Sequence, residues 1–561
     1  MKKEWKNITV YQIYPKSFCD SNGDGYGDIK GIISKLDYLE KLGIGAIWLT
    51  PIYCSPQVDN GYDISDYYDI DEMFGSKQDF LELLNEAHKR NIKIIMDIVI
   101  NHTSDKHEWF QKAFIEKNEK YRNYYIVRPG KDGKEPNNWK SFFGGSAWEK
   151  IEGEDNYYLH LFAKEQPDLN WECDELRKEV IHMMQYWLEL GVDGFRLDVI
   201  NLISKEQDFC DDLENVVIPG KRYYINGPRI HEFLKEVNKE VFKPYEALTV
   251  GETMNASIED AKKYTAPSNQ ELDMIFSMDH MEVDYKDGDR WTVQKTDFLK
   301  LKNILSNWQE QLEEVGGWNS LFWSNHDQPR VVSRFGDEGK YRIVSAKMLA
   351  TILHMLKGTP YIYQGEEFGM LNPGYETIEE YNDIESLNVF QERTKMGLDI
   401  STIMEGINRQ SRDNARSPMQ WNDSEGSGFS SATPWMKMGK SYVDINAEND
   451  LENEDGVFYH YQKLIELRKK EEVIVEGTYK RLDNNDPNVW CYMREGEKEA
   501  VLVIGNFYDK KTSFSLPDTF CEKYEIKDLI LSNYKNTKIY EKEILLNEYE
   551  ANVYKCVLRT R

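Results

Sequence analysis

Short runs of apolar, β-branched and aromatic residues recur along most of the chain, and stretches with the apolar spacing of amphipathic helices generally follow them. Strands that alternate with helices are typical of a parallel sheet, and eight such repeats predict an α/β fold, a closed (β/α)8 TIM barrel. The clearest predicted helices span residues 32–41, 77–90 and 176–190. The predicted strands are residues 10–15, 44–51, 92–102, 192–200, 247–253, 272–278, 319–328 and 359–367.

Two long segments interrupt this alternation. Residues 104–172 follow the third strand and are rich in aromatic residues, Gly and Asn, which is typical of a small irregular inserted domain. Residues 369–454 form a second excursion after the eighth strand, before a helix at 457–470. From residue 477 onward short alternating strands indicate an antiparallel β-sandwich. The predicted domains are a barrel of residues 1–103 and 173–476, an inserted domain of residues 104–172, and a C-terminal sandwich of residues 477–561.

Composition narrows the class of partner. The chain has 98 acidic and 70 basic residues, and its net charge of −28 disfavours nucleic acid or an anionic membrane as a partner. Its seven cysteines are odd in number and lack CxxC spacing, which favours small buried side chains in a reducing cytosol over a disulfide framework. The start MKKEWKNITVYQIYP lacks the apolar core of a signal peptide. We therefore expect a cytoplasmic protein, a monomer or weak homodimer.

Charged and polar residues gather where the predicted strands end. In a (β/α)8 barrel the carboxyl ends of all strands meet at one face, which carries the active site. Several carboxylates on one rim are expensive to keep for stability alone, so their convergence predicts a catalytic site. The strand-end residues are Asp97, Asn101, His102, Arg196, Asp198, Glu252, His326, Asp327, Glu366 and Glu367.

Four sequence motifs at these strand ends resemble those of a known enzyme family. The segments DIVINH (97–102), GFRLDVI (194–200), VGET (250–253) and SNHDQPR (324–330) resemble, in order, the four sequence regions of glycoside hydrolase family 13. QPDLN (166–170) resembles the fifth region of its oligo-1,6-glucosidase branch. Further similar segments extend along nearly the whole chain, namely VYQIYPKSF, SPQVDNGYDI, NWKSFFGGSAW, GTPYIYQGEE and RDNARSPMQW.

The resemblance implies a retaining α-glucosidase with three catalytic carboxylates. Asp198 would be the nucleophile that forms a covalent glucosyl-enzyme, Glu252 the acid/base, and Asp327 the third carboxylate. Arg196 lies two residues before Asp198 on the same strand face, so we expect it to pair with Asp198 and keep it ionised. Glu252 needs a raised pKa to act as an acid. Retention would place the carboxyl groups of Asp198 and Glu252 about 5–5.5 Å apart.

The resemblance also implies a pocket that takes one glucose from the non-reducing end of its substrate. Tyr62 would stack on the sugar, Asp59 and Arg412 would bind its outer hydroxyls, and His102 and His326 would donate hydrogen bonds. Weaker candidates for the pocket wall are Phe143, Phe162 and Gln166, of which the two phenylalanines are equally well explained as packing residues of the inserted domain.

The loop DSNGDGYGD (20–28) places oxygen ligands at alternate positions. An EF-hand would need Glu at the twelfth position, which is Gly31, so that motif is excluded. The loop resembles a calcium loop of the glucosidase branch, which implies a structural Ca²⁺ and no organic cofactor; the alternative is a surface loop rich in Asx turns. The implied ligands are the side chains of Asp20, Asn22, Asp24 and Asp28 and the carbonyl oxygen of Tyr26.

The substrate is the open question, because two groups of enzymes share the local motifs. Val199 after the nucleophile resembles enzymes that cleave α-1,6 bonds, but trehalose-6-phosphate hydrolases also carry Val there and resemble DVINLISK (198–205). A phosphoryl group needs a nearby Arg or Lys. In those hydrolases an Arg usually follows LISK by three residues, where this chain has Asp208, and Lys205 alone is a poor phosphate site.

We therefore predict hydrolysis of isomaltose and short isomalto-oligosaccharides, with trehalose 6-phosphate as the alternative substrate. Sucrose isomerisation is less favoured because the Thr after the nucleophile and the charged RLDRD-like loop of those enzymes are not evident here. A non-catalytic barrel, as in transporter heavy chains, would need a membrane span and would have lost the catalytic acids. This chain keeps all three acids and has no run of ~18 apolar residues.

Overall fold

The computed structural model describes residues 3–213, 216–538 and 542–559, and the chain divides into two compact units. Unit 1 comprises Met1–Ile47 and Asp279–Arg561, and unit 2 comprises Trp48–Met278. The division falls within strand β2 (Ala46–Leu49). Across the described ranges, no helix has the length and apolar character that crossing a bilayer requires.

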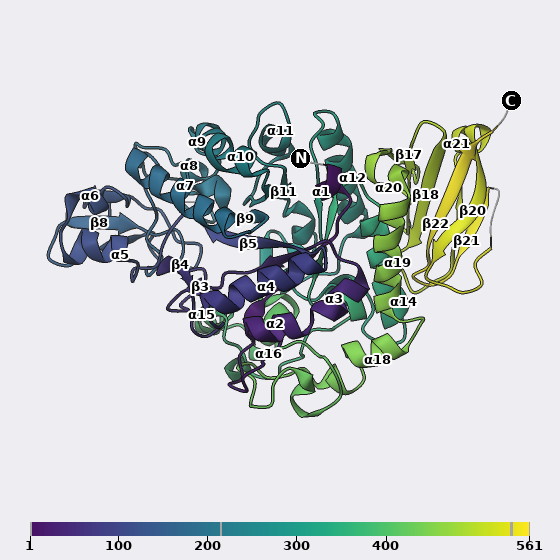
Figure 1. Cartoon of the computed structure of the whole chain (residues 1–561), viewed down its shortest axis with the longest axis horizontal. Coiled ribbons are helices and arrows are strands. Elements are labelled where there is room, and N and C mark those ends of the chain that lie inside the picture. The colour runs from purple at the N-terminus through teal and green to yellow at the C-terminus, as the bar shows by residue number, and fades with distance from the viewer. Residues whose placement is uncertain (1–2, 214–215, 539–541, 560–561) are drawn as a thin grey trace. The chain divides into compact units, whose positions relative to one another are not determined.

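Unit 2 is built on four parallel strands that are hydrogen-bonded in the order β5, β9, β10, β11. Figure 1 labels β5, β9 and β11. Helices precede each of them in sequence, including α9 (Ile230–Val237) before β10, as the alternation in the sequence predicts. Nearly every strand residue is buried, which is why the strands appear in the sequence as continuous apolar runs. The elements are α4 (Lys77–Lys89), β5 (Lys93–Val99), α7 (Asp174–Glu189), β9 (Gly194–Asp198), β10 (Leu248–Glu252), α11 (Ile258–Thr265) and β11 (Met274–Phe276).

Unit 1 contains the parallel strands β1 (Val10–Ile13), β15 (Thr359–Tyr363) and β14 (Ser320–Leu321), with β15 in the middle. The strand predicted at 319–328 is therefore much shorter. Beyond Leu321 the chain leaves the strand, and Asn325 accepts a hydrogen bond from the backbone N–H of Asp327 at 2.8 Å in an Asx turn.

The single helix predicted at 32–41 is wrong, because two helices occupy this region. Helix α2 (Ile29–Ser34) is capped by Asp28 and ends at Lys35, whose φ of −107° and ψ of 4° leave the helical range, and α3 (Leu36–Leu42) follows. Apolar residues on both sides of the break are buried, so the periodicity continues across Lys35 and did not reveal it.

The segment predicted as an inserted domain carries a three-stranded antiparallel sheet in the order β6 (Val127–Pro129), β8 (Asn156–Leu159), β7 (Trp148–Lys150). It belongs to unit 2, and its core continues into the residues after β9. The domain limits at 104 and 172 stay predictions.

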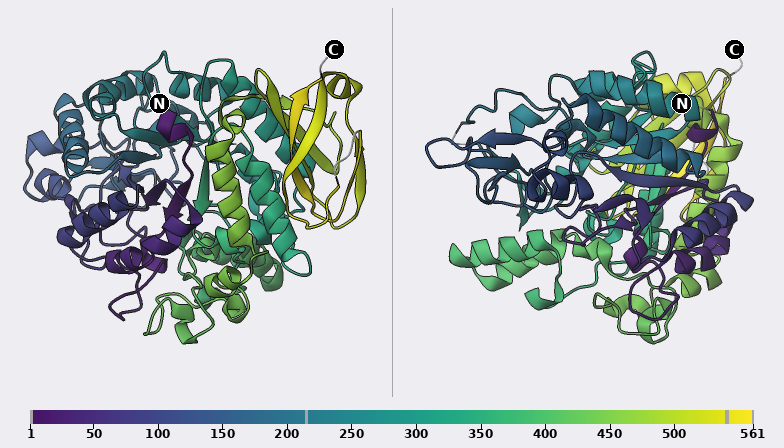
Figure 2. Two further views of the ribbon diagram at one scale, coloured as in Figure 1. Left: turned by 45° about the vertical axis from the view of Figure 1, so that its right-hand side comes forward. Right: turned by 60° about the vertical axis from the view of Figure 1, so that its left-hand side comes forward.

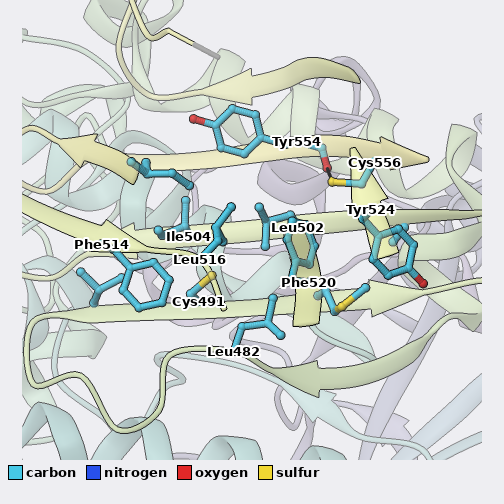
Figure 3. Packing of buried hydrophobic residues seen from close by; sticks show 14 of the residues in the cluster. Leu482, Cys491, Leu502, Ile504, Phe514, Leu516, Phe520, Tyr524, Tyr554 and Cys556 are labelled. Atoms are coloured by element: carbon cyan, nitrogen blue, oxygen red, sulfur yellow. Dashed lines mark hydrogen bonds between the residues drawn. The ribbon is translucent and has the colours of Figure 1, made fainter. Parts of the chain in front are cut away.

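The C-terminal residues form a two-layered antiparallel sandwich within unit 1. A five-stranded sheet faces the pair β19 (Thr512–Ser515) and β21 (Glu543–Leu546), and Figure 3 shows the apolar side chains packed between the layers. Helix α14 (Arg342–His354) lies beside the larger sheet (Figures 1 and 2) and contacts its outer face. Tyr492 on this face donates to the carbonyl of Ile352 at 2.6 Å. The larger sheet consists of β16 (Thr478–Arg481), β17 (Val489–Glu495), β18 (Glu499–Asn506), β22 (Ala551–Leu558) and β20 (Tyr524–Ser532).

The excursion after the eighth predicted strand contains two helices that the sequence analysis did not predict, α15 (Ile384–Lys395) and α16 (Ile400–Gln410). Helix α16 packs on β13 (Asp289–Val293). A Cβ at Gly406 would lie 2.1 Å from the carbonyl oxygen of Trp291, so only glycine allows this approach. The predicted closing helix is present as α19 (Val457–Lys470).

The seven cysteines are all free, but they are not all buried as expected. Cys19, Cys491 and Cys556 are buried core residues, whereas Cys210 is exposed. The expectation of small buried side chains therefore holds for only part of the set.

Candidate active site

A cluster of three carboxylates around one guanidinium lies at the carboxyl ends of the strands of unit 2. Arg196 on β9 donates from Nη1 to Asp97 Oδ1 at 2.7 Å and to Asp198 Oδ1 at 2.6 Å, and from Nη2 to Glu252 Oε2 at 2.6 Å. Parallel pairing of β5, β9 and β10 brings the three acids to this one cation. The pair expected between Arg196 and Asp198 is present, but it is one of three.

Burial outweighs Arg196 in this cluster, contrary to the expectation that Arg196 keeps Asp198 ionised. Burial raises the pKa of the Asp198 carboxyl well above its ordinary value, Glu252 and Asp97 raise it further, and Arg196 opposes the shift. Burial likewise raises the pKa of Asp97 to about 6, again against the effect of Arg196. One guanidinium shared by three carboxylates cannot neutralise them all, so the cluster is poised to hold and exchange protons.

Val199, the residue directly after Asp198, has a strained backbone. Its φ of 36° and ψ of 42° lie in the left-handed region, which β-branched residues rarely enter. Its N–H donates to Glu252 Oε2 at 3.3 Å, and its side chain is buried among Leu202 and other apolar residues. The strained residue therefore directly follows Asp198 and donates a hydrogen bond to Glu252. Backbone strain of this kind is common at functional sites.

The predicted sugar-binding residues of unit 2 form one hydrogen-bonded group beside the cluster. Tyr62 donates through its hydroxyl to Asp97 Oδ2 at 3.0 Å. Gln166 Nε2 donates to Asp59 Oδ2 at 3.2 Å and lies 3.1 Å from His102 Nε2. His102 Nε2 also lies 3.2 Å from the carbonyl oxygen of Tyr62. All four side chains are nearly buried, so a ligand meets preset polar groups here.

Two aromatic rings border this group. The ring of Phe162 lies 5.2 Å from that of His102, and Phe143 meets Phe162 edge-on at 5.7 Å. Both phenylalanines are half-buried, and Phe162 also packs against the core of the inserted segment. Phe162 therefore packs in the inserted segment and also contacts His102, and its place in the pocket wall stays a prediction.

Lys205 is committed to a buried ion pair. Its ammonium group contacts Asp168 Oδ2 at 2.9 Å and donates to Asn101 Oδ1 at 3.0 Å and to the carbonyl of Leu202 at 2.8 Å. The side chains of Lys205 and Asp168 are 1% and 0% exposed. Lys205 therefore links buried groups of the protein to one another, and its ammonium group is not available to a ligand.

The predicted site residues of unit 1 form a second group around Asp327. Arg416 donates to Asp327 Oδ1 at 2.7 Å, Arg412 lies 3.7 Å from the same atom, and His326 Nε2 lies 3.2 Å from Oδ2. Burial disfavours the charge of Asp327, but His326, Arg416 and Arg412 outweigh it and hold its pKa well below the ordinary range. Asp327 is thus a fixed anion, in contrast to the shared protons of the Arg196 cluster.

Sequence reasoning missed several partners of these residues. Arg416 lies one helical turn after Arg412 in RDNAR, and that spacing was a usable signal for a second cation. Asp383 accepts from Arg412 at 2.6 Å, and Asp168 pairs with Lys205. These two acids lie far from their partners in sequence, and although Asp168 stands in the QPDLN segment, no local pattern links either acid to its partner.

The loop 20–28 uses its polar side chains mainly to fix its own turns. Asp20 accepts backbone N–H groups of Asn22, Gly23 and Gly25, and Asp24 accepts that of Tyr26 at 2.8 Å. Asp28 is buried and caps helix α2. Among the described residues no cluster of three or more His, Cys, Asp or Glu side chains is arranged to hold a metal. The donor set of carboxylate, amide and carbonyl oxygens still matches what Ca²⁺ takes.

Comparison with known proteins places this geometry in a family. Residues 12–477 match the model of the alpha-amylase catalytic domain, and residues 489–553 match that of the alpha-amylase SusG C-terminal domain. An oligo-1,6-glucosidase of Parageobacillus thermoglucosidasius is 53% identical over 99% of both chains. A trehalose-6-phosphate hydrolase of Bacillus subtilis (strain 168) is 50% identical over 98% of both.

A crystal structure of the trehalose-6-phosphate hydrolase TreA of Bacillus licheniformis superposes with a TM-score of 0.95 at 52% identity, covering 99% of each chain. This full-length match, together with the catalytic-domain model, confirms the predicted fold class, a (β/α)8 barrel with a C-terminal β-sandwich.

Proposed function

Because the chain belongs to glycoside hydrolase family 13, the alpha-amylase family, and is therefore a glycoside hydrolase, we propose that it is a retaining α-glucosidase that cleaves α-1,6 bonds of isomaltose and short isomalto-oligosaccharides. It would act from the non-reducing end and release one glucose in each cycle. The two relatives described above carry names of two different activities, so the choice between the substrates rests on the residues of this chain.

The proposed chemistry assigns one role to each carboxylate. Asp198 attacks the anomeric carbon and forms the covalent glucosyl-enzyme, while Glu252 gives its proton to the leaving oxygen. In the second step Glu252 takes a proton from water, which attacks the same carbon and frees Asp198. Asp327, held as an anion, accepts hydrogen bonds from sugar hydroxyls, and Arg196 stabilises the charges that move between Asp198 and Glu252.

The contacts of Lys205 are the main support for a substrate without a phosphoryl group. A phosphoryl group of charge near −2 requires a cation able to turn toward it. Lys205 is fully committed to Asp168, Asn101 and Leu202, and the exposed residue three positions later is Asp208, which repels an anion. Breaking the Lys205 ion pair to bind phosphate would leave Asp168 as an uncompensated buried charge, at a cost of about 3–5 kcal/mol.

Initial rates on isomaltose, maltose, trehalose and trehalose 6-phosphate test the proposal directly. The expected order places isomaltose first, with trehalose 6-phosphate at least about 10-fold slower in kcat/KM, since one lost charged hydrogen bond is worth about that factor or more. Dominant cleavage of trehalose 6-phosphate would reject the neutral substrate and mean that residues other than Lys205 bind its phosphate.

The proposal includes a structural Ca²⁺ in the loop 20–28, held by Asp20, Asn22, Asp24, Asp28 and the carbonyl of Tyr26. The ion would supply charge neutralisation to the turn and take no part in catalysis, since none of these residues belongs to either group of site residues described above. A cytoplasmic location and a monomeric or weakly dimeric state complete the proposal; cell fractionation and light scattering at several concentrations test them.

A further inference from the structure

The buried amide of Asn101 lies between Lys205 and His102, and its orientation follows from elementary hydrogen bonding. Lys205 has only donors, so the amide atom 3.0 Å from its ammonium group must be the oxygen. The NH₂ group of Asn101 then faces Asp168 Oδ2 at 3.2 Å and His102 Nδ1 at 3.2 Å. Both acceptors can be served at once, because the amide nitrogen carries two protons.

This orientation decides which nitrogen of His102 carries the proton. Burial lowers the pKa of His102 to about 4, so the ring is neutral near pH 7 and has one N–H. Nδ1 of His102 faces the NH₂ group of Asn101, which is a donor, so Nδ1 must accept and carries no proton. The proton is therefore on Nε2, which lies 3.2 Å from the carbonyl oxygen of Tyr62. With the proton on Nε2, the contacts to Asn101 and Tyr62 are both hydrogen bonds.

The side chain of Gln166 disfavours the Nε2–H tautomer of His102. Its Oε1 accepts the N–H of Ala163 at 3.0 Å, so its NH₂ group faces His102 Nε2 at 3.1 Å and would prefer a bare nitrogen there. If Asn101 turned over, its oxygen could accept a proton from Nδ1 and Gln166 could donate to Nε2. The ring therefore has two hydrogen-bonded arrangements, and the orientation of Asn101 selects between them.

We propose that Lys205 is a positioning residue, which by fixing the Asn101 amide holds His102 as the Nε2–H tautomer, whose N–H a bound sugar would share with the carbonyl oxygen of Tyr62. Lys205 itself does not touch the substrate. The consequence for catalysis rests on the proposed function, in which His102 binds a sugar hydroxyl. The tautomer itself does not depend on that function.

The test is the protonation pattern of His102 in protein with ¹⁵N-labelled histidine. Long-range ¹H–¹⁵N correlation separates the two tautomers, and loss of one ring signal in His102→Gln assigns it among the ten histidines. Wild-type protein should show a protonated Nε2 and a bare Nδ1. A wild-type ring protonated at Nδ1 overturns the proposal without any variant.

The informative variant is the double substitution Lys205→Met with Asp168→Asn, because it removes both members of the ion pair and leaves no buried unpaired charge. It should shift His102 toward Nδ1–H and raise KM for isomaltose about 10-fold with a smaller change in kcat, since one hydrogen bond to the sugar is lost. Lys205→Arg keeps the cation and should retain the Nε2–H tautomer.

Lys302→Met is the matched control. Lys302 is also fully buried, contacts Asp483 Oδ1 at 3.3 Å and donates to the carbonyl of Val489 at 2.8 Å, but it lies away from the site residues. It should lower the thermal stability without changing the tautomer or KM. An unchanged Nε2–H tautomer in the folded double variant would refute the role of Lys205. A shifted tautomer in an enzyme that never cleaves isomaltose would instead reject the proposed function alone.

Discussion

Replacing Arg196 with methionine should move the acid limb of the pH profile upward. Arg196 is the cation nearest to Asp97, Asp198 and Glu252, with contacts of 2.6–2.7 Å. Charge centres about 4 Å apart attract by about 4 kcal/mol at an effective dielectric constant of 20, which corresponds to about three pKa units. Each of the three carboxylates experiences this attraction separately, so about one unit is a lower bound on the rise of each pKa.

The direction of the shift in the pH profile follows from the protonation state that catalysis requires of each carboxyl group. Removing a positive charge favours the protonated carboxyl, so each pKa rises, and the ionised nucleophile is lost at a higher pH than in the wild type. The assay is kcat/KM for isomaltose at closely spaced pH values in wild-type protein, Arg196→Met and Arg196→Lys. The acid limb should rise by at least about one pH unit in Arg196→Met and by less in Arg196→Lys, which keeps a charge.

Arg177→Met is the control for this experiment. Arg177 is another largely buried arginine of unit 2, with an ion pair to Glu236 Oε2 at 2.7 Å, but it lies outside the cluster. It should reduce stability and leave the pH profile in place. If the acid limb of folded Arg196→Met coincides with that of the wild type, then Arg196 does not set the ionisation of the catalytic carboxylates and our reading of the cluster is wrong.

Further predictions concern the nucleophile, the substrate, the metal and stability. Asp198→Asn should lower kcat by at least about 10⁴-fold with an unchanged circular dichroism spectrum; near-normal activity would remove the assignment. Asp208→Arg should raise kcat/KM for trehalose 6-phosphate about 10-fold or more by adding a charged hydrogen bond and removing a repulsion, while isomaltose cleavage stays within a factor of two or so. Calcium should raise the melting temperature of wild-type protein but not of Asp24→Ala; equal melting curves with calcium and with chelator would contradict the metal site. Burial raises the pKa values of Glu366 and Glu367 to about 7, so the stability they confer is full below about pH 4.5 and is lost as pH rises through about 7. Denaturant unfolding of Glu366→Gln should therefore show a smaller loss of stability between pH 5 and pH 8, by up to about 3 kcal/mol; an equal loss in both proteins would mean that Glu366 does not titrate in this range.

Much of the scaffold could be predicted because its signals are local. Buried parallel strands require continuous apolar runs, and each of the eight predicted runs contains an observed strand. Strand ends then indicated Asp97, Arg196, Asp198 and Glu252 before any geometry was known. Their convergence on one guanidinium follows from parallel pairing alone.

What the sequence could not reveal depends on the folded chain as a whole. The left-handed backbone of Val199 carries no residue signal, since a β-branched side chain normally argues against it. The Lys205–Asp168 pair and the Arg412–Asp383 pair join residues 37 and 29 positions apart, and only folding brings them together. Helix propensity likewise did not show the break at Lys35, where no glycine or proline interrupts the pattern.

The central claim combines α-1,6 cleavage with retention through a covalent intermediate, and one measurement tests both. Hydrolysis of isomaltose followed by ¹H NMR in the first minutes resolves the two anomers of the released glucose before mutarotation mixes them. The glucose from the reducing end leaves as the anomeric mixture it already was, so only the glucose from the non-reducing end reports the stereochemistry. Our account predicts that the glucose released first contains more α-anomer than the equilibrium mixture, as two displacements at the same carbon require. An initial excess of β-anomer over the equilibrium mixture would contradict the assignment of Asp198 as nucleophile, and no release of glucose from isomaltose would contradict the proposed substrate.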